Sequence, residues 1–190
     1  MRSMRFKKKK EVEAEQEEHL RIITFTVGEE LFGADILRIK QVDIFEKCNK
    51  MPDLPNFIEG FIFIRKELVP LIDLRKRLYN REGNVDLQTR IIVAMVANNM
   101  VGFVVDSVVQ VMTVPKQAIT QPPKIMTRVD EDYLQGVVAV NNQRILLIDF
   151  DKILSKNKRR ELLNLLSEEE KTELLKLVLD EKKKNVVEKN

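Results

Sequence analysis

One β-rich pattern occurs twice in this chain, and that repeat constrains the fold more than any other feature of the sequence. Residues 60–78 align without gaps on residues 136–154. Earlier in each copy, Gly33 aligns with Gly102. We therefore interpret the chain as two copies of one module.

Each copy begins with a predicted β-hairpin, because short runs of β-branched and aromatic residues are interrupted there by turn-forming residues. A proline-containing stretch, a second hairpin and a short basic helix follow in both copies. The first hairpins are expected to consist of strands at 22–27 and 31–39 around a turn at 28–30, and of strands at 91–96 and 100–111 around a turn at Asn98 and Asn99.

These patterns predict an all-β fold of two small β-barrels packed on a shared core, with a C-terminal helical extension. Copies of roughly 65 to 75 residues are marginally stable alone, because a small domain buries a smaller fraction of its surface. Small antiparallel sheets remove exposed edges by closing into barrels. We expect a charged leader at 1–20, a β domain at 21–154 and a helical tail at 155–190. The two modules cover about 21–88 and 89–154, with their end strands either kept or exchanged between the barrels.

The tail contains a predicted helix with an apolar stripe. Ser167 and Glu170 have the spacing of a capping box, which begins a helix. Leu174, Leu175 and Val178 follow as its apolar positions. The stripe either docks on the β domain or binds a partner, and docking is the more common role of a helical apolar stripe.

The charge balance argues against a nucleic-acid-binding domain. The chain has 33 basic and 30 acidic residues, a formal net charge of +3, which produces no domain-wide field for a polyanion. The basic residues at 2–10 precede an acidic run and lack an apolar face, so we interpret them as a solvated tail rather than a membrane-surface patch. No apolar h-region follows them, and no apolar run has the length of a membrane span. We expect a cytoplasmic protein without direct membrane insertion.

The residue inventory does not support an active site. The single histidine, His19, lies in the charged leader, and the single cysteine, Cys48, has no histidine to act as its base. One cysteine forms no internal disulfide and no metal cluster, which fits a reducing compartment. The six glycines are isolated, so none builds a phosphate-binding loop. Asp73, Asp106 and Asp149 end or follow apolar strands, where turn and cap roles are common, so we expect no enzymatic activity, metal or cofactor.

A specific motif occupies residues 55–75. Its order is Pro-x-x-hydrophobic-x-Gly, then a turn that contains Arg65, then Val-Pro-Leu-Ile-Asp-Leu-Arg at 69–75. This order resembles the hallmark of the CheW family of chemotaxis coupling proteins. The opening hairpin and the closing repeat at 136–154 also follow the family's order, so the resemblance covers about residues 22–154.

The resemblance implies two five-stranded, SH3-like β-barrels and a non-catalytic adaptor. The implied partners are the regulatory domain of a CheA-type histidine kinase, the cytoplasmic tips of methyl-accepting chemoreceptors and other CheW copies in rings, at membrane-associated receptor arrays in the cytoplasm. The implied receptor-binding residues are Ile39, Gln41, Gly60, Phe63 and Arg65, and the implied kinase-binding residues are Phe45, Met51 and Lys66.

Three positions depart from the family pattern. Phe63 and Lys66 replace the Asn and Gly of the family's turn, and Gln41 stands where Glu is frequent. The Glu–Arg ion pair of the family therefore becomes at most a hydrogen bond between Gln41 and Arg65. These changes imply an altered preference for receptors.

Strand alternation predicts which side chains share a face with Arg65. It places Phe61, Phe63 and Arg65 on one face, with Ile62 and Ile64 on the other. If the isoleucines fill the core, aromatic rings surround an exposed Arg65, a composition favoured at interfaces. The alternative places the two phenylalanines in the core between the barrels.

Two other functions stay open from the sequence. A divergent CheW-like scaffold can form rings mainly with itself, and a β-barrel protein with basic ends can bind nucleic acid. Phosphate-driven binding falls steeply with salt, which distinguishes the nucleic-acid alternative from the adaptor.

Overall fold

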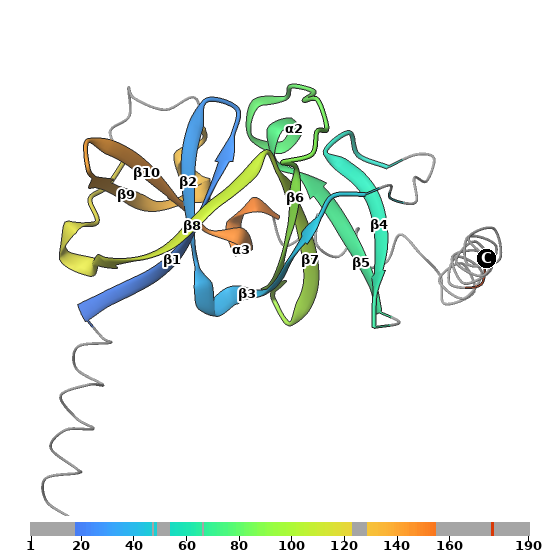
Figure 1. Ribbon diagram of the computed structural model, residues 1–190, viewed down its shortest axis with the longest axis horizontal. Helices are drawn as coiled ribbons and strands as arrows, with labels where there is room; N and C mark the ends of the chain where they lie inside the picture. Colours follow the sequence, from blue (N-terminus) through green and yellow to red (C-terminus); the bar gives the residue numbers. More distant parts are fainter. Residues whose placement is uncertain are drawn as a thin grey trace, which may run out of the picture.

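The computed structural model describes residues 18–46, 48, 54–65, 67–122, 129–154 and 176, whose strands lie in two five-stranded sheets side by side (Figure 1). Sheet A contains, in order, β8 (Ser107–Pro115), β1 (His19–Val27), β2 (Glu30–Asp35), β10 (Gln143–Ile148) and β9 (Leu134–Val140). Sheet B contains β3 (Ile39–Ile44), β6 (Arg90–Val96), β7 (Asn99–Val105), β5 (Glu67–Asp73) and β4 (Ile58–Ile64). The short helices are α2 (Leu74–Tyr79) and α3 (Phe150–Ile153), and the 3-10 turns are η1 (Ile36–Arg38), η2 (Lys116–Ala118) and η3 (Glu131–Tyr133).

These sheets confirm the predicted fold class, but they do not coincide with the two sequence copies. Sheet A combines β1 and β2 of the first copy with β9 and β10 of the second, whereas sheet B combines β6 and β7 of the second copy with β4 and β5 of the first. Within each sheet the two hairpins meet through a parallel pair, β2 with β10 or β5 with β7. The chain therefore crosses between the sheets at η1 and again at Asp106 (Figure 1).

Each crossing divides a segment that the sequence pattern predicts as one strand. The single strand expected at 31–39 is wrong, because β2 ends at Asp35, whose carboxylate accepts a hydrogen bond from the Leu37 backbone N–H at 2.9 Å and caps η1. The strand expected at 100–111 divides at Asp106, which separates β7 from β8. Periodicity does not reveal these breaks, since strand-forming apolar residues lie on both sides of them.

The hairpin turns place non-glycine residues at positive φ. A two-residue type I′ turn needs positive φ at both central positions. In the β6–β7 turn these residues are Ala97 and Asn98, with φ of 45° and 69°, so the turn expected at Asn98 and Asn99 was placed one residue too late. The β9–β10 turn uses Asn141 and Asn142, with φ of 50° and 62°. Asn tolerates this conformation better than most residues, which explains its place in both turns.

Buried apolar residues form one cluster within each sheet and a larger cluster between the sheets. Leu71 and Val93 belong to the cluster of sheet B, and Ile22 and Leu147 belong to that of sheet A. The larger cluster takes residues from both sheets. Each fully buried side chain of this size contributes about 1.5–3 kcal/mol. The predicted shared core is thus present, and separating the sheets would expose it.

Aromatic rings connect the two sheets through α3, which lies between them in Figure 1. The ring of Phe150 stacks on Phe103 of sheet B at 4.1 Å between centroids, and lies 6.4 Å from Phe25 of sheet A. Asp149 begins α3, because its carboxylate accepts a hydrogen bond from the Asp151 backbone N–H at 3.0 Å. The cap role predicted for Asp149 is confirmed, and it holds Phe150 at the centre of the shared core.

The repeat glycines lie where parallel strands approach closely. Gly33 pairs with Leu147, and Gly102 pairs with Leu71. A β-carbon at Gly102 would lie 2.4 Å from a methyl group of Leu71, and one at Gly33 would lie 3.0 Å from three neighbouring side chains. Both positions therefore exclude a larger side chain, which accounts for the glycine match in the repeat.

Residues beyond the outer strands help to close each sheet. After β8, the backbone of Thr120 exchanges two hydrogen bonds with Val137 of β9, at 2.8 and 2.9 Å. After β3, the thiol of Cys48 donates a hydrogen bond to the backbone oxygen of Glu59 in β4 at 3.2 Å. Both contacts join segments from opposite ends of a sheet, as a barrel requires.

Helix α2 fastens sheet B to sheet A. The guanidinium of Arg77 lies between two aromatic rings, 5.2 Å from the centroid of Phe57 and 4.7 Å from that of Tyr133. Its Nε also donates a hydrogen bond to the Ile153 backbone oxygen at 2.9 Å. Cation–π contacts of this kind gain strength when they are shielded from water. Arg77 thus ties α2 to both η3 and α3.

Asp73 caps α2 from a buried position. Its carboxylate accepts hydrogen bonds from the backbone N–H groups of Arg75 and Lys76 at 2.8 and 3.1 Å. Burial raises the pKa of Asp73 above the usual value of 3.8, in spite of these hydrogen bonds and the neighbouring positive charges. The predicted structural role of Asp73 is confirmed. Because the carboxyl group is buried, its ionised form lowers the free energy of unfolding.

Asp73→Asn should therefore increase the free energy of unfolding at neutral pH, since Asn keeps a cap acceptor and removes a buried charge. A raised pKa means that the folded state binds this proton more tightly than the unfolded state. The cost of ionised Asp73 is present above the folded pKa and disappears as the pH falls below 3.8. Urea unfolding at pH 7 and pH 3.5 should show the gain only at pH 7.

Asp73→Ala is the control, because it removes the cap at either pH and should cost about 1 kcal/mol. An Asp73→Asn protein less stable than the parent at pH 7 would contradict this account.

Candidate functional site

A surface groove of about 540 Å³ lies at the end of sheet B, and we name it the Gln41 groove. Three segments surround it: the start of β3, the β4–β5 turn and the β6–β7 turn. It is open to solvent and offers both charged and apolar groups. Its lining residues are Lys40, Gln41, Ile64, Arg65, Glu67, Leu68, Met95, Asn98, Asn99 and Met100.

Arg65 occupies the turn between β4 and β5. Its side chain is exposed, and its φ of 49° is unusual for a residue with a β-carbon. That conformation costs on the order of 1–2 kcal/mol. The tight turn places Arg65 in the lining of the groove together with Gln41, so two of the predicted receptor-binding residues share one groove.

Gln41 makes a hydrogen bond that the sequence analysis did not anticipate. Its side-chain Nε2 donates to a carboxylate oxygen of Asp43 at 2.5 Å. The two residues are neighbours on one face of β3, because side chains two positions apart in a strand point the same way. Asp43 therefore orients the Gln41 amide through its Nε2, and among the described residues no hydrogen bond between Gln41 and Arg65 is formed.

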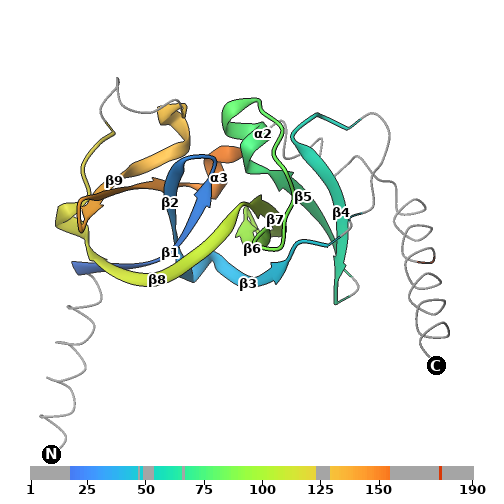
Figure 2. The same cartoon turned by 45° about the horizontal axis from the view of Figure 1, so that its top comes forward.

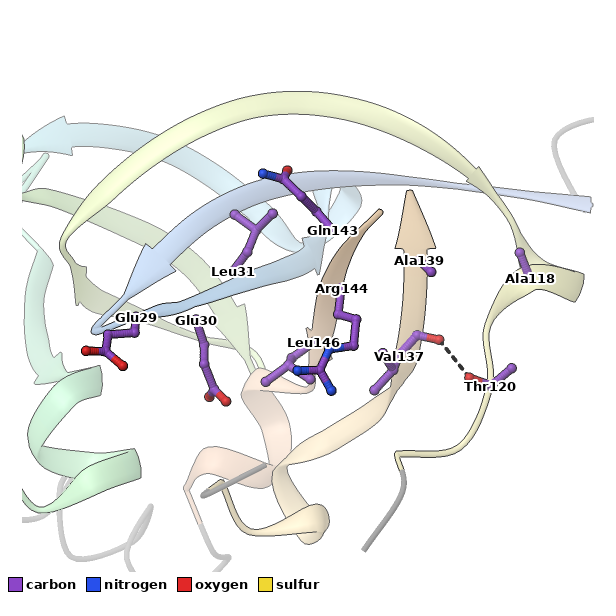
Figure 3. Close-up of a pocket in the computed structure, with 10 residues that line it drawn as sticks. All are labelled: Glu29, Glu30, Leu31, Ala118, Thr120, Val137, Ala139, Gln143, Arg144 and Leu146. Atoms are coloured by element: carbon purple, nitrogen blue, oxygen red, sulfur yellow. Dashed lines mark hydrogen bonds between the residues drawn. The ribbon is translucent and has the colours of Figure 1, made fainter. Parts of the chain in front are cut away.

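A second cavity of about 480 Å³ lies in sheet A, and we name it the Glu30 cavity (Figure 3). Glu29, Glu30 and Leu31 line one side of it, and Figure 3 shows the Arg144 side chain from β10 reaching toward Glu30. In the register that aligns Gly33 with Gly102, the first three residues correspond to the groove residues Asn98, Asn99 and Met100. The repeat thus produces equivalent hollows in both sheets, where the parallel strands diverge.

The outer strands of both sheets expose apolar side chains. In β3, Val42 and Ile44 are 38% and 63% exposed, and in β8, Val109 and Val111 are 53% and 49% exposed. Figure 2 shows β3 and β8 along the same lower side of the molecule. Soluble proteins usually protect the edge strands of a sheet with charges, prolines or covering segments. Apolar outer strands therefore point to a surface that another protein covers.

The other predicted site residues have different locations. Ile39 is half-buried and packs against the shared core, and Gly60 is buried at a register shift in β4 with φ of 150°. Phe63 is half-buried in β4. Phe45 is half-buried against the cluster of sheet B, and its backbone N–H donates to Thr89 O at 3.1 Å. Met51 and Lys66 lie outside the described residues.

Of the two arrangements left open around Arg65, the structure places Phe61 in the interior. Phe61 is 2% exposed and Ile64 is 8% exposed, so both sides of β4 contribute buried residues. Alternation therefore does not separate core from surface along this strand, because both of its faces are covered. Phe61 is therefore a core residue and Phe63 is half-buried, so the alternative with two exposed phenylalanines beside Arg65 is not formed.

Within the described ranges, no group of three or more His, Cys, Asp or Glu residues could hold a metal ion. His19 is exposed at the first position of β1 rather than in the leader. No described helix is long and apolar enough to span a membrane. The predicted helix that begins at Ser167 lies outside the described residues, apart from Lys176.

Sequence reasoning missed the apolar outer strands. Val109 and Val111 belonged to the run interpreted as one strand at 100–111, and Leu37, which is 85% exposed in η1, belonged to the strand expected at 31–39. A continuous apolar run does not show which strand lies at the end of a sheet. In β8 the signal that could have found them is the lack of alternation, since Val108, Val109, Val111 and Met112 place apolar side chains on both faces.

Comparisons with known proteins agree on one family. A family model described as "CheW-like domain" matches residues 21–158. The chain is 28% identical over 156 residues to "Chemotaxis protein CheW" of Treponema pallidum, covering 80% of this chain and 92% of that one. It is 30% identical over 136 residues to "Chemotaxis protein CheW" of Klebsiella aerogenes, covering 72% and 82%.

A solved structure has the same fold. The scaffolding protein TtCheW from Thermoanaerobacter tengcongensis superposes with a TM-score of 0.68 at 29% identity. The match covers 73% of this chain and 90% of that protein. The similarity therefore extends over the two sheets and is not limited to one motif.

Gln41→Glu should lower stability at neutral pH, because it replaces the donor to Asp43 with a second carboxylate. The two negative charges repel each other at this distance, so the loss of stability should be largest at low salt and should shrink as salt is added. For half-exposed groups the cost should stay below about 1 kcal/mol. Thermal melts at low salt measure it.

Gln110→Glu is the matched control, because Gln110 occupies the repeat-equivalent position in β8 and is exposed. A melting temperature that rises at pH 7 for Gln41→Glu would show instead that the new carboxylate pairs with Arg65.

Proposed function

This chain belongs to the CheW-like domain family, and on that premise we propose that it is a non-catalytic adaptor that couples the cytoplasmic tips of chemoreceptors to a CheA-type histidine kinase. One observation supports a binding role most directly: one outer strand in each sheet, β3 in sheet B and β8 in sheet A, exposes valine or isoleucine side chains. The relatives are named for chemotaxis, and one solved relative is named a scaffolding protein. An adaptor of this kind acts in the cytoplasm at membrane-associated receptor arrays.

We assign the receptor tip to the Gln41 groove. The exposed guanidinium of Arg65 can donate to a receptor carboxylate in bidentate geometry. Ile64, Leu68 and Met100 supply apolar lining next to it. Methionine adapts its shape to different partners, which suits a groove that serves more than one receptor.

We assign the kinase regulatory domain to the end of β3 that lies away from the groove. Ile44 is 63% exposed there, and Phe45 packs half-buried beside it. Leu87 is 90% exposed in the loop before β6, and its backbone oxygen accepts a hydrogen bond from Arg90, the β6 partner of Ile44. This apolar end and the Gln41 groove use different ends of β3, so both partners can bind together.

Arg65→Glu should weaken binding to a receptor-tip fragment, because a repulsive charge replaces an attractive one in the groove. A loss of about 2–5 kcal/mol is typical where the pair is desolvated, and the exposed position of Arg65 favours the lower end, about 2 kcal/mol or thirtyfold. Calorimetry with the fragment measures the change. The fold should persist, since the side chain is exposed in a turn.

Arg81→Glu makes the same charge change at an exposed position that does not line the groove, and it should bind like the parent. A folded Arg65→Glu protein with the affinity of the parent would rule out the groove as the receptor site. Binding of nucleic acid with a steep salt dependence, or closed rings of this chain alone in sedimentation, would favour the competing functions.

Ile44→Ser should weaken binding to the kinase regulatory domain by about 1–2 kcal/mol, five- to thirtyfold, because it removes an apolar side chain from the proposed contact. Receptor binding should be unchanged. Val111→Ser makes a similar apolar-to-polar change on β8, which is assigned to neither the receptor nor the kinase, so it should bind both partners like the parent. Equal loss of both partners in Ile44→Ser would show that the two sites are not separate.

A further inference from the structure

Two carboxylates hold equivalent hairpin turns at the junction of the sheets. Asp106 accepts a hydrogen bond from the backbone N–H of Gly28 at 2.8 Å, and Asp151 accepts one from the backbone N–H of Ala97 at 3.1 Å. Gly28 and Ala97 correspond to each other in the register that aligns Gly33 with Gly102. Each carboxylate therefore binds the first residue of the corresponding turn in one of the two copies.

Each of these carboxylates also pairs with an arginine. The carboxylate lies at the crossing and the arginine in the helix in one pair, and the two positions are reversed in the other. Asp106 lies at a crossing between the sheets and pairs with Arg75 of α2. Asp151 lies in α3 and pairs with Arg38 of η1, at the other crossing. Arg75 and Asp151 are equivalent in the alignment of 60–78 on 136–154. The helix thus supplies the cation in the first copy and the anion in the second.

The Asp151 contacts reach both walls of the Gln41 groove. Arg38 immediately precedes β3 and lies close in the chain to Lys40 of the lining. Ala97 immediately precedes Asn98, which lines the groove on the β6–β7 turn. One carboxylate outside the groove therefore contacts the segments that carry its two sides.

Asp151 itself has a fixed position. Its backbone N–H donates to the carboxylate of Asp149, and the neighbouring Phe150 is 4% exposed in the aromatic stack between the sheets. The side chain consequently extends from an anchored backbone. Such an anchor is what a group needs if it is to set the separation of two other segments.

We propose that Asp151 is a positioning residue for the Gln41 groove. Through Arg38 and the Ala97 N–H it holds the start of β3 and the β6–β7 turn at the separation that receives a partner. The consequence for receptor affinity rests on the proposed function, whereas the effect on the two walls does not.

The pair is more open to solvent than its counterpart. The side chains of Arg38 and Asp151 are 51% and 29% exposed, against 17% and 25% for Arg75 and Asp106. Salt screens exposed charges more strongly than shielded ones. Added salt should therefore loosen the walls of the Gln41 groove before it affects the corresponding turn in sheet A.

Amide hydrogen exchange tests the contact on the full chain without any partner. Asp151→Ala should accelerate exchange of the Ala97 amide about tenfold or more, because its hydrogen-bond acceptor is removed. The Gly28 amide should be unchanged. Asp106→Ala is the matched control and should show the reverse pattern. Unchanged exchange at Ala97 in Asp151→Ala would overturn the proposal.

Exchanging the charges of Arg38 and Asp151 tests the positioning role of Asp151 even if one of the single variants is unstable. Arg38→Asp and Asp151→Arg should each weaken binding of a receptor-tip fragment about tenfold, whereas the double variant should recover to within about threefold of the parent. Recovery is expected because the Arg75–Asp106 pair already uses that arrangement in the first copy. A double variant no better than either single variant would overturn the proposal.

The outcomes separate this inference from the proposed function. If the parent binds the receptor tip and Asp151→Ala binds it equally well despite faster Ala97 exchange, the positioning role is wrong. If the parent does not bind the receptor tip, the proposed function fails. In that case amide exchange alone tests whether the charge pair holds the two walls of the groove. Slow exchange of Ala97 in the double variant supports this inference, and fast exchange overturns it.

Discussion

The stacking of Phe150 between the two sheets is the contact on which the rest of the structure depends. It brings a ring from α3 to 4.1 Å from Phe103 of sheet B and to 6.4 Å from Phe25 of sheet A. Each sheet has only a small cluster of its own, and the larger cluster lies between them. Because the rings pack in one arrangement, the sheets keep one relative orientation. Arg77 secures the same junction from α2.

Each sheet contains hairpins from both copies, so the junction between the sheets is part of the fold of each copy. The chain passes from sheet A to sheet B at η1 and returns at Asp106, so neither sheet can form from one copy alone. This arrangement also leaves β3 and β8 as outer strands with exposed valines and isoleucine. One outer strand in each sheet thus exposes apolar side chains, which suits the proposed adaptor role.

The two copies share their backbone contacts and hollows, but they differ in the side chains found there. Both place a carboxylate under the N–H of an equivalent turn residue, yet the residue that supplies it moves from the crossing to the helix. Both form a hollow where parallel strands diverge, yet one carries Glu29 and Glu30 where the other carries Asn98 and Asn99. Backbone requirements explain the constant part, because unpaired amides at turns must find acceptors. The side chains that line the two hollows therefore differ in charge, since Glu29 and Glu30 are acidic and Asn98 and Asn99 are neutral.

From the sequence alone, the repeat and its strand patterns determined the all-β class and the duplication, because turn chemistry and periodicity are local, and the family motif grouped Gln41 with the turn at Arg65. The tertiary structure alone decided which hairpin joins which sheet, since runs such as 31–39 and 100–111 carry no mark of where they leave one sheet for the other. It also decided that Phe61 is buried and that Gln41 bonds to Asp43. Those outcomes depend on strand order, register shifts and distances between segments far apart in the chain, which no local pattern encodes.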